Sequence, residues 1–469
     1  MTDIAELDLT HAGARVTGHG LDAWMAEIRE LLKLAGPLVV TQLAQMAIMT
    51  TDVLMLGHYS NTALASAQMG NTAFFFCWIL GCGPVAAVSP MIAHILGARP
   101  SDRAGVRAVV RMGFWSVIIT SIPLIVLLSF FVKPAMLAFH EAPELARGAA
   151  TFTGVLCFGL PFSLGYQVLR NYSTALSRPK ASLWVMLAAI LFNLFGDYAL
   201  IFGHFGAPRL GILGSALAST CSYAFSFLSM LAVVHLMPGL SKYRILRRFF
   251  RVHWEKLGEV FRLGAPIGFT MMFEAMLFNV SMLVMGAFGT VYAVAHTIAL
   301  NVPSITFMVP LGIGMAATVR VGLAAGARDG EAVRRAGYGA MLAGACFMAA
   351  MSVLIWSFPE TIARLYVDGG AQDAVVVGMA VVFLHVVAAF QIFDGLQVVS
   401  ALSLRGLKDA NAPMWIAGGS YWLAGAPMCA WLAFGLHMKG LGIWIGLAFG
   451  LLVAAAAMTA RFWFLSRER

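Results

Sequence analysis

The chain has 469 residues, of which 60% are hydrophobic and only 11% are charged. Soluble domains carry about 25% charged residues because their surfaces must stay hydrated. The composition therefore excludes an ordinary soluble fold and indicates a protein solvated largely by lipid. The formal net charge of +9 is of the kind found in nucleic-acid-binding proteins. Here, however, the basic residues lie in short connections between apolar runs, and we expect no nucleic-acid partner.

Residues 1–33 are expected to form a cytoplasmic N-terminal segment that ends in a short amphipathic helix over 21–33. Twelve apolar runs follow, each long enough to cross a bilayer as a helix of about 20 residues. They cover 34–57, 68–92, 108–131, 152–174, 183–202, 212–236, 263–287, 295–319, 337–358, 375–402, 414–434 and 441–464. The sequence therefore predicts an all-α membrane protein with twelve transmembrane helices.

The polar stretch after the sixth run divides the chain into lobes. We predict an N-terminal lobe over 34–236, a basic cytoplasmic linker over 237–262, a C-terminal lobe over 263–464 and a cytoplasmic tail over 465–469. Of the 31 Lys and Arg residues, 26 fall on the side of the membrane that holds both termini. Because positively charged connections stay in the cytoplasm, both termini are expected there, in a multi-pass protein of a bacterial inner membrane.

The two lobes are related by an internal repeat with a constant offset. One and the same shift places residues 33–37 on 262–266, Gly57 on Gly286 and residues 97–99 on 326–328. Six helices repeated in six give two lobes of the same orientation. Transporters are often built from such repeats, with the substrate bound between the halves as access alternates. The repeat predicts two pseudo-symmetric six-helix bundles.

Four acidic residues lie within the predicted spans: Asp52, Asp197, Glu274 and Asp394. A charge at the bilayer centre costs at least about 2.5–3.5 kcal/mol, so such residues are functional candidates. Asp52 and Asp197 both lie about 8–9 Å inside the outer ends of their spans, which places them at one depth. Asn193 precedes Asp197 by one helical turn. Two carboxylates and an amide suit either a Na⁺ ion or a shared proton.

Glu274 lies near mid-membrane, and Asp394 has Gln391 and Gln397 three residues away on either side. The repeat does not pair the acids, so the lobes are expected to hold different sites. For His296, a proton relay and a structural hydrogen bond both remain open. Polar or flexible side chains near the acids are candidates for lining a substrate cleft: Gln42, Gln45, Met49, His296, Asn301, Gln391 and Gln397.

Several stretches together resemble the NorM branch of the multidrug and toxic compound extrusion (MATE) family, from Leu34 to about Phe464. The stretches are 51–57, 193–203, 263–268 with Glu274, 295–301, 394–398 and 404–409. The resemblance implies two six-helix bundles around a central cleft. It also implies efflux of bulky organic cations in exchange for Na⁺ or H⁺, with no other cofactor and no enzymatic step. We expect a monomer.

In this family the residues that match Glu274 and Asp394 belong to a cation site of the C-terminal half. Those that match Asp52, Asn193 and Asp197 form an N-terminal site, joined by a hydroxyl of the sixth span for which Ser219 is the match. The chain departs from many relatives in having Asp197 in place of Asn and Ser219 in place of Thr.

Two other functions compete with transport of cations. An intramembrane protease could use two buried aspartates to activate water, but residues 194–197 lack the first Gly of a Gly-x-Gly-Asp motif. A carrier of lipid-linked phosphates would favour basic residues inside its spans. These spans offer little beyond Arg170, which we interpret as a snorkelling anchor near the inner end of the fourth span.

Overall fold

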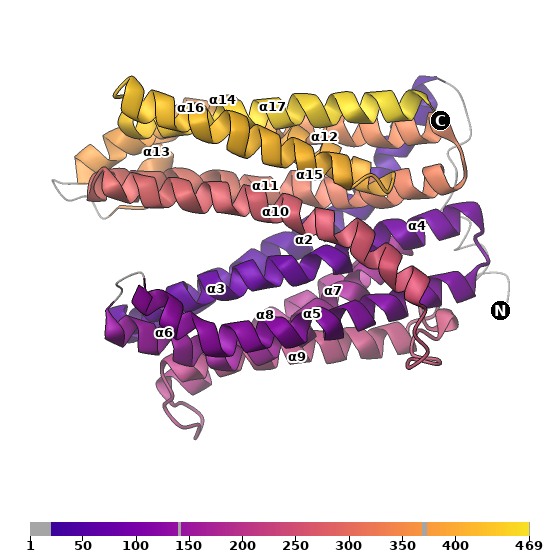
Figure 1. The fold of residues 1–469 in the computed structure, drawn as a ribbon, viewed down its shortest axis with the longest axis horizontal. Coiled ribbons are helices and arrows are strands. Elements are labelled where there is room, and N and C mark those ends of the chain that lie inside the picture. The colour runs from indigo at the N-terminus through magenta and orange to yellow at the C-terminus, as the bar shows by residue number, and fades with distance from the viewer. Residues whose placement is uncertain (1–19, 139–141, 368–372, 469) are drawn as a thin grey trace. The chain divides into compact units, whose positions relative to one another are not determined.

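The computed structural model describes residues 20–138, 142–367 and 373–468, and the described residues form helices joined by short loops, without strands (Figure 1). The prediction of an all-α membrane protein is confirmed. Residues 1–19 of the expected N-terminal segment 1–33, and the final residue of the tail, lie outside the described residues. The expected amphipathic helix is continuous with the first span, because α2 runs over Leu21–Tyr59.

The helices follow the predicted spans closely and extend beyond most of them. The first group comprises α2, α3 (Asn61–Ala86), α4 (Val88–Ala98), α5 (Arg103–Ala138), α6 (Pro143–Leu156), α7 (Leu160–Ala175), α8 (Pro179–Phe202) and α9 (Ile212–Leu236). The second comprises α10 (Trp254–Ala287), α11 (Thr290–Gly326), α12 (Gly330–Ser357), α13 (Pro359–Arg364), α14 (Asp373–Gly406), α15 (Asn411–Gly418), α16 (Ala426–Ala430) and α17 (Lys439–Arg467).

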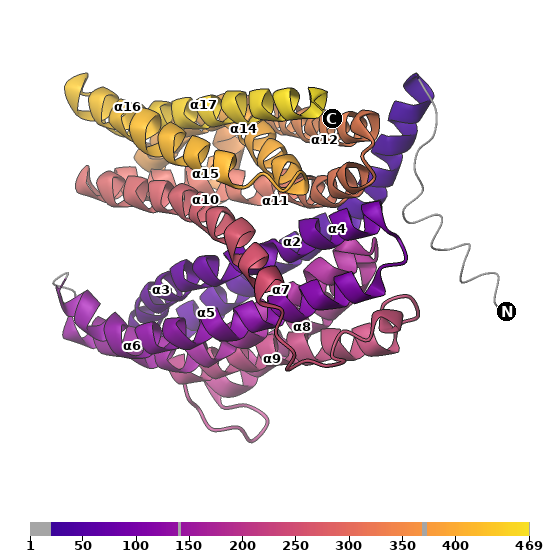
Figure 2. The same ribbon diagram turned by 45° about the vertical axis from the view of Figure 1, so that its right-hand side comes forward.

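Within the described ranges, eleven helical runs are long and apolar enough to cross a membrane. The remaining predicted span, 414–434, is a helix interrupted twice by π-helical turns, at Gly419–Gly425 and at Trp431–Gly435. This interrupted run lies along α17 (Figures 1 and 2). A π-helical turn inserts an extra residue into the helix and is frequently found at functional sites.

Contacts divide the chain into two compact units. Unit 1 includes Val40–Gly268, and unit 2 includes Phe269–Arg469 together with the described residues up to Val39. These units depart from the predicted lobes 34–236 and 263–464, because the beginning of α2 is grouped with unit 2 and the beginning of α10 with unit 1. The boundaries between the units fall after Val39 in α2 and after Gly268 in α10. These two boundaries are related by the repeat, because its offset places Val39 on Gly268.

The same close helix contact occurs once in each unit. In unit 1, a Cβ on Gly83 would lie 2.6 Å from the carbonyl oxygen of Gly264 and 2.9 Å from Cα of Gly268. In unit 2, a Cβ on Gly312 would lie 2.8 Å from the backbone nitrogen of Val39. The two contacts are equivalent under the repeat, because its offset places Gly83 on Gly312 and Val39 on Gly268. Glycine is needed at both positions because the helix backbones approach so closely.

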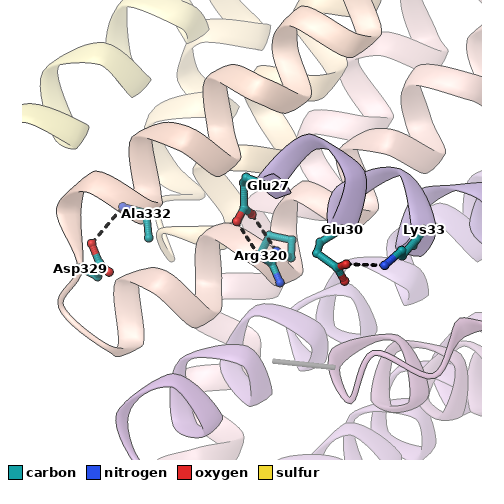
Figure 3. Close-up of polar contacts among 6 residues, drawn as sticks. All are labelled: Glu27, Glu30, Lys33, Arg320, Asp329 and Ala332. Carbon is teal, nitrogen blue, oxygen red and sulfur yellow. Dashed lines mark hydrogen bonds and ion pairs between the residues drawn. The ribbon is translucent and has the colours of Figure 1, made fainter. Parts of the chain in front are cut away.

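In unit 2, a buried ion pair fixes the beginning of α2 (Figure 3). Arg320 of α11 donates from Nε and Nη2 to the carboxylate of Glu27, at 2.7 and 2.5 Å. The two side chains are only 10% and 5% exposed. Next to this pair on α2, Lys33 donates to Glu30 in an exposed pair. Leu31, Leu34, Ala35 and Leu38 add the apolar face of the same segment to the core of unit 2.

Unit 1 encloses α7 almost completely. Of its 16 residues, 14 are buried, and the two that are not, Pro161 and Phe162, lie in its first turn. The buried polar side chains of this helix include Gln167, Arg170, Asn171 and Thr174, together with the hydroxyl-bearing rings of Tyr166 and Tyr172. A buried polar side chain needs a hydrogen-bond partner, so α7 is a place to look for a binding function.

Candidate functional site

The predicted N-terminal acids come together in unit 1. Asp52 lies on α2, Asn193 and Asp197 on α8, and Ser219 on α9. Ser219 Oγ donates to Asp52 Oδ2 at 3.1 Å, and the Asp52 carboxylate lies beside the side chains of Asp197 and Asn193. Asp197 is fully buried and Asn193 is 1% exposed. The helical spacing that places Asn193 and Asp197 on one face therefore directs both toward α2.

Several polar atoms of this cluster have no partner within the described residues. They are Asp52 Oδ1, both carboxylate oxygens of Asp197 and both amide atoms of Asn193. Buried polar groups in native proteins are nearly always hydrogen-bonded, and two neighbouring carboxylates repel each other when both are ionised. A proton shared between the acids, or a hard cation held by their oxygens, would satisfy both requirements. The donor set fits either coupling ion.

The two predicted C-terminal acids also lie near each other, in unit 2. Glu274 of α10 and Asp394 of α14 are close enough to interact electrostatically, and both interact with Tyr421. Asp394 is 5% exposed and Tyr421 is fully buried. The Tyr421 hydroxyl lacks a partner among the described residues. This tyrosine belongs to the first π-helical turn.

Tyr421 was missed by reasoning from the sequence. A tyrosine in an apolar span has no periodicity that separates it from core or lipid-facing aromatic residues. The adjacent pair Gly418-Gly419 was the available signal, since glycines reduce helix stability and mark places where a helix departs from regular geometry.

Two glutamines flank Asp394 on α14, as predicted, and their environments differ. Gln391 exchanges hydrogen bonds with Thr306 of α11: its Nε2 donates at 2.9 Å and its Oε1 accepts at 3.2 Å. Gln397 is 1% exposed, and its Oε1 has no partner in the described part of the chain. Gln391 is therefore held by its neighbour, whereas Gln397 keeps an acceptor for a ligand or a water molecule.

The polar residues of α11 are held by packing within unit 2. His296 is fully buried, its Nε2 lies 3.3 Å from Ser281 Oγ, and its ring centre is 5.1 Å from that of Trp444. Asn301 donates from Nδ2 to the backbone carbonyl of Thr297, one turn earlier on the same helix. His296 Nδ1 has no partner within the described residues, so the proton relay and the structural hydrogen bond both stay predictions for this residue.

The predicted cleft residues of α2 lie beside Arg170. Its Nη1 donates to Gln42 Oε1 at 2.6 Å and to Gln45 Oε1 at 3.1 Å, whereas Met49 is 49% exposed. The interpretation of Arg170 as a snorkelling anchor is wrong. Its side chain is 6% exposed, and its guanidinium group donates to Gln42 and Gln45 in the middle of the predicted first span, whereas a snorkelling side chain keeps its charge in water.

The chain matches known proteins over nearly its whole length. A family model described as MatE matches residues 37–199 and again residues 266–431, which together make up more than half of the chain. The chain belongs to the MatE family. A protein named probable multidrug resistance protein NorM, from Mesorhizobium japonicum, is 41% identical over 460 residues that cover 98% of this chain and 97% of that protein. A protein of the same name from Brucella suis is 39% identical over 440 residues, covering 94% and 93% of the two chains.

The MatE match itself contains the repeat. Its two parts begin at Pro37 and Pro266, which are the two prolines that the repeated motifs place on each other. The fold agrees with that of the eukaryotic MATE transporter AtDTX14, with a TM-score of 0.85 at 22% identity over 95% of this chain and 98% of that one. The resemblance predicted from the sequence is confirmed, and the protein is a multi-pass membrane transporter.

Proposed function

We propose that this protein is a secondary active antiporter that exports small organic cations in exchange for Na⁺ or H⁺ by alternating access. It acts as a carrier and not as an enzyme, and it needs no cofactor beyond the coupling ion. We place it as a monomer in a bacterial inner membrane with both termini in the cytoplasm. The bacterial relatives named for multidrug resistance support the substrate class, and the unequal distribution of Lys and Arg supports the orientation.

The observation that carries the proposal is the cluster of Asp52, Asp197, Asn193 and Ser219. Asp52 Oδ1 and both carboxylate oxygens of Asp197 lack partners within the described residues, and a pair of carboxylates without a counter-ion is unfavourable in a low-dielectric interior. A proton or Na⁺ that enters from outside neutralises the pair. An ion can shift the equilibrium between two conformations only through its different affinity for each. The buried carboxylate of Asp197 beside Asp52 provides that difference, because only a conformation that closes over this acid desolvates it.

The second cluster, Glu274 with Asp394 and Tyr421, gives unit 2 its own cation site. Its acids interact with each other, so a bound cation is favourable there as well. Two separate acidic sites allow one to hold the coupling ion while the other attracts the positive group of the substrate. The repeat does not place the acids of one unit on the acids of the other, and this difference fits such a division of roles.

The test is export of ethidium from proteoliposomes under imposed gradients. A Na⁺ gradient at constant pH and a pH gradient without Na⁺ are applied separately, and the gradient that drives export identifies the coupling ion. Asp52→Asn, Asp197→Asn, Glu274→Gln and Asp394→Asn are each compared with Glu144→Gln, which removes an exposed carboxylate of α6.

We expect gradient-driven export to fall at least tenfold in the four site variants and to remain within a factor of two in the control. If all four site variants keep full export under the driving gradient, the assignment of the acids is incorrect. If the wild-type protein exports no ethidium under either gradient, the proposed exchange is incorrect.

A further inference from the structure

The loop between α9 and α10, residues 237–253, is fixed along the first half of α5 by side chains that bind its backbone. Three side chains of α5 donate to backbone carbonyl oxygens of this α9–α10 loop at 2.8–3.1 Å: Arg107 to Tyr243, Arg111 to Arg248 and Trp115 to Phe249. The three donors follow one another at intervals of four residues, which places them on one face of α5. The backbone of the loop is therefore held in place at three successive turns of this helix.

The side chains of the α9–α10 loop divide into a buried and an exposed set. Tyr243 and Ile245 are buried, and the Phe249 ring stacks on that of Trp115 with 6.2 Å between the ring centres. Four arginines of the loop are exposed: Arg244, Arg247, Arg248 and Arg251. Three large apolar side chains of the loop and the first residue of α10 are exposed as well, at 41%, 87% and 75%: Leu246, Phe250 and Trp254. The exposed set thus interleaves positive charges with apolar groups.

The positive charges of this region have no counter-charge nearby in the chain. No Asp or Glu occurs between Asp197 and Glu255, and the four exposed arginines form no ion pair within the described residues. Arg111 is 4% exposed, and its Nε lacks a partner in the described part of unit 1. The charged groups that act on it are all positive: Arg107, Arg248 and Arg251. Because like charges repel, an anion bound among these side chains would lower the free energy of the folded loop.

An anionic phospholipid fits this surface better than a soluble anion does. Guanidinium groups bind phosphate through paired N–H donors, and aromatic side chains beside positive charges are typical of segments that lie at the interface between membrane and water. A free phosphate ion would use the arginines alone and leave Phe250 and Trp254 in water. The loop directly joins the predicted spans 212–236 and 263–287, which keeps its arginines close to the headgroups.

We propose that the α9–α10 loop binds anionic phospholipids, with their phosphates at four arginines and their chains beside two aromatic residues: Arg244, Arg247, Arg248 and Arg251, with Phe250 and Trp254. Arg111 is a positioning residue, because its hydrogen bond to the carbonyl oxygen of Arg248 holds the loop in place. In the proposed orientation of the chain, these lipids belong to the cytoplasmic leaflet. The inference goes beyond the proposed antiport and requires neither a substrate nor a coupling ion.

Native mass spectrometry of the purified full-length protein measures this binding through the lipids that remain attached. Phosphatidylglycerol and phosphatidylcholine with identical acyl chains are titrated separately, so that the two lipids differ only in the headgroup and its net charge. The variant Arg248→Gln/Arg251→Gln removes two charges of the loop. The matched control Arg328→Gln/Arg334→Gln removes two exposed arginines where α11 meets α12, on the same predicted side of the membrane.

Each basic side chain near an anionic membrane surface contributes about fivefold in affinity. We expect the wild-type protein to bind phosphatidylglycerol at least about tenfold more tightly than phosphatidylcholine. Arg248→Gln/Arg251→Gln should weaken phosphatidylglycerol by at least about tenfold and phosphatidylcholine by less than about twofold, and the control should change neither lipid by more than about twofold. Phe250→Ser should weaken both lipids by the same factor, because the burial of an apolar side chain does not depend on the headgroup.

Three results would overturn the inference. Equal affinity of the wild-type protein for the two lipids, or equal weakening by the loop variant and its control, would reduce the arginines to a signal for orientation. Displacement of phosphatidylglycerol by an equal concentration of glycerol 3-phosphate, which lacks acyl chains, would make this a site for soluble phosphates. The measurement uses no gradient, so a failure of the proposed antiport leaves its outcome unchanged.

Discussion

The buried ion pair between Glu27 and Arg320 gives a sharp test of how the beginning of α2 is held. The variant Glu27→Gln keeps the shape of the side chain but leaves the Arg320 guanidinium buried without its carboxylate, at 10% exposure. Removing one partner of a buried pair costs about 3–5 kcal/mol. For a domain of the size of unit 2, each kcal/mol lowers the melting temperature by about 2–4 °C. The expected loss is therefore about 6–20 °C, measured by circular dichroism or fluorescence-detected size exclusion of the purified protein in detergent.

Two further variants separate this effect from a general loss of surface charge. Lys33→Gln breaks the neighbouring ion pair with Glu30. The Lys33 and Glu30 side chains are 58% and 29% exposed, and exposed ion pairs contribute at most about 1 kcal/mol to the free energy of unfolding. The double variant Glu27→Leu/Arg320→Leu replaces both charges by apolar groups and should recover most of the stability. If the Glu27→Gln protein melts within about 2 °C of the wild type, the pair contributes no more than a surface contact and does not hold the beginning of α2.

Two other predictions concern the helix packing and the second acidic site. In Gly264→Ala the new Cβ would meet the backbone of Pro84, and we expect a loss of about 1–3 kcal/mol in the same melting experiment. Gly258→Ala on the same helix meets nothing within 4 Å and should be neutral or stabilising; equal melting of the two would contradict the packing described for unit 1. Tyr421→Phe removes a buried hydroxyl beside Glu274, so we expect unchanged stability but a half-saturating ion concentration for export raised about tenfold. An unaltered ion dependence would exclude the hydroxyl as an ion ligand.

Much of the fold follows from features that the sequence states directly. Lipid forces each apolar run of sufficient length into a helix, so α9 begins and ends at the bounds of the predicted span 212–236. Most other helices are longer than predicted, because helices such as α11 continue beyond the bilayer, where hydropathy no longer marks them. The repeat was readable because short motifs with glycine and proline, such as residues 33–37 and 262–266, recur in both halves at one offset. The structure adds the reason for Gly83 and Gly312, which allow two helices to touch.

The limits of the sequence appear where a residue depends on distant neighbours. Asp52, Asn193 and Asp197 could be grouped because helical spacing and depth alone place them at one level. The partner of Arg170 could not be predicted, since its contact with Gln42 joins residues 128 positions apart and no periodicity reports it. Likewise, hydropathy described 414–434 as a regular span, although a π-helical turn within it directs Tyr421 toward the acids.

Running the exchange in reverse shows whether the carboxylates of Asp52 and Asp197 couple export to an entering ion. Proteoliposomes receive an outward gradient of ethidium with no ion gradient, and the uptake of Na⁺ or H⁺ against its own electrochemical potential is followed. We expect uphill uptake of one of the two ions by the wild-type protein and none by Asp52→Asn/Asp197→Asn. Ethidium efflux that moves neither ion, or equal ion uptake by the double variant, would contradict it.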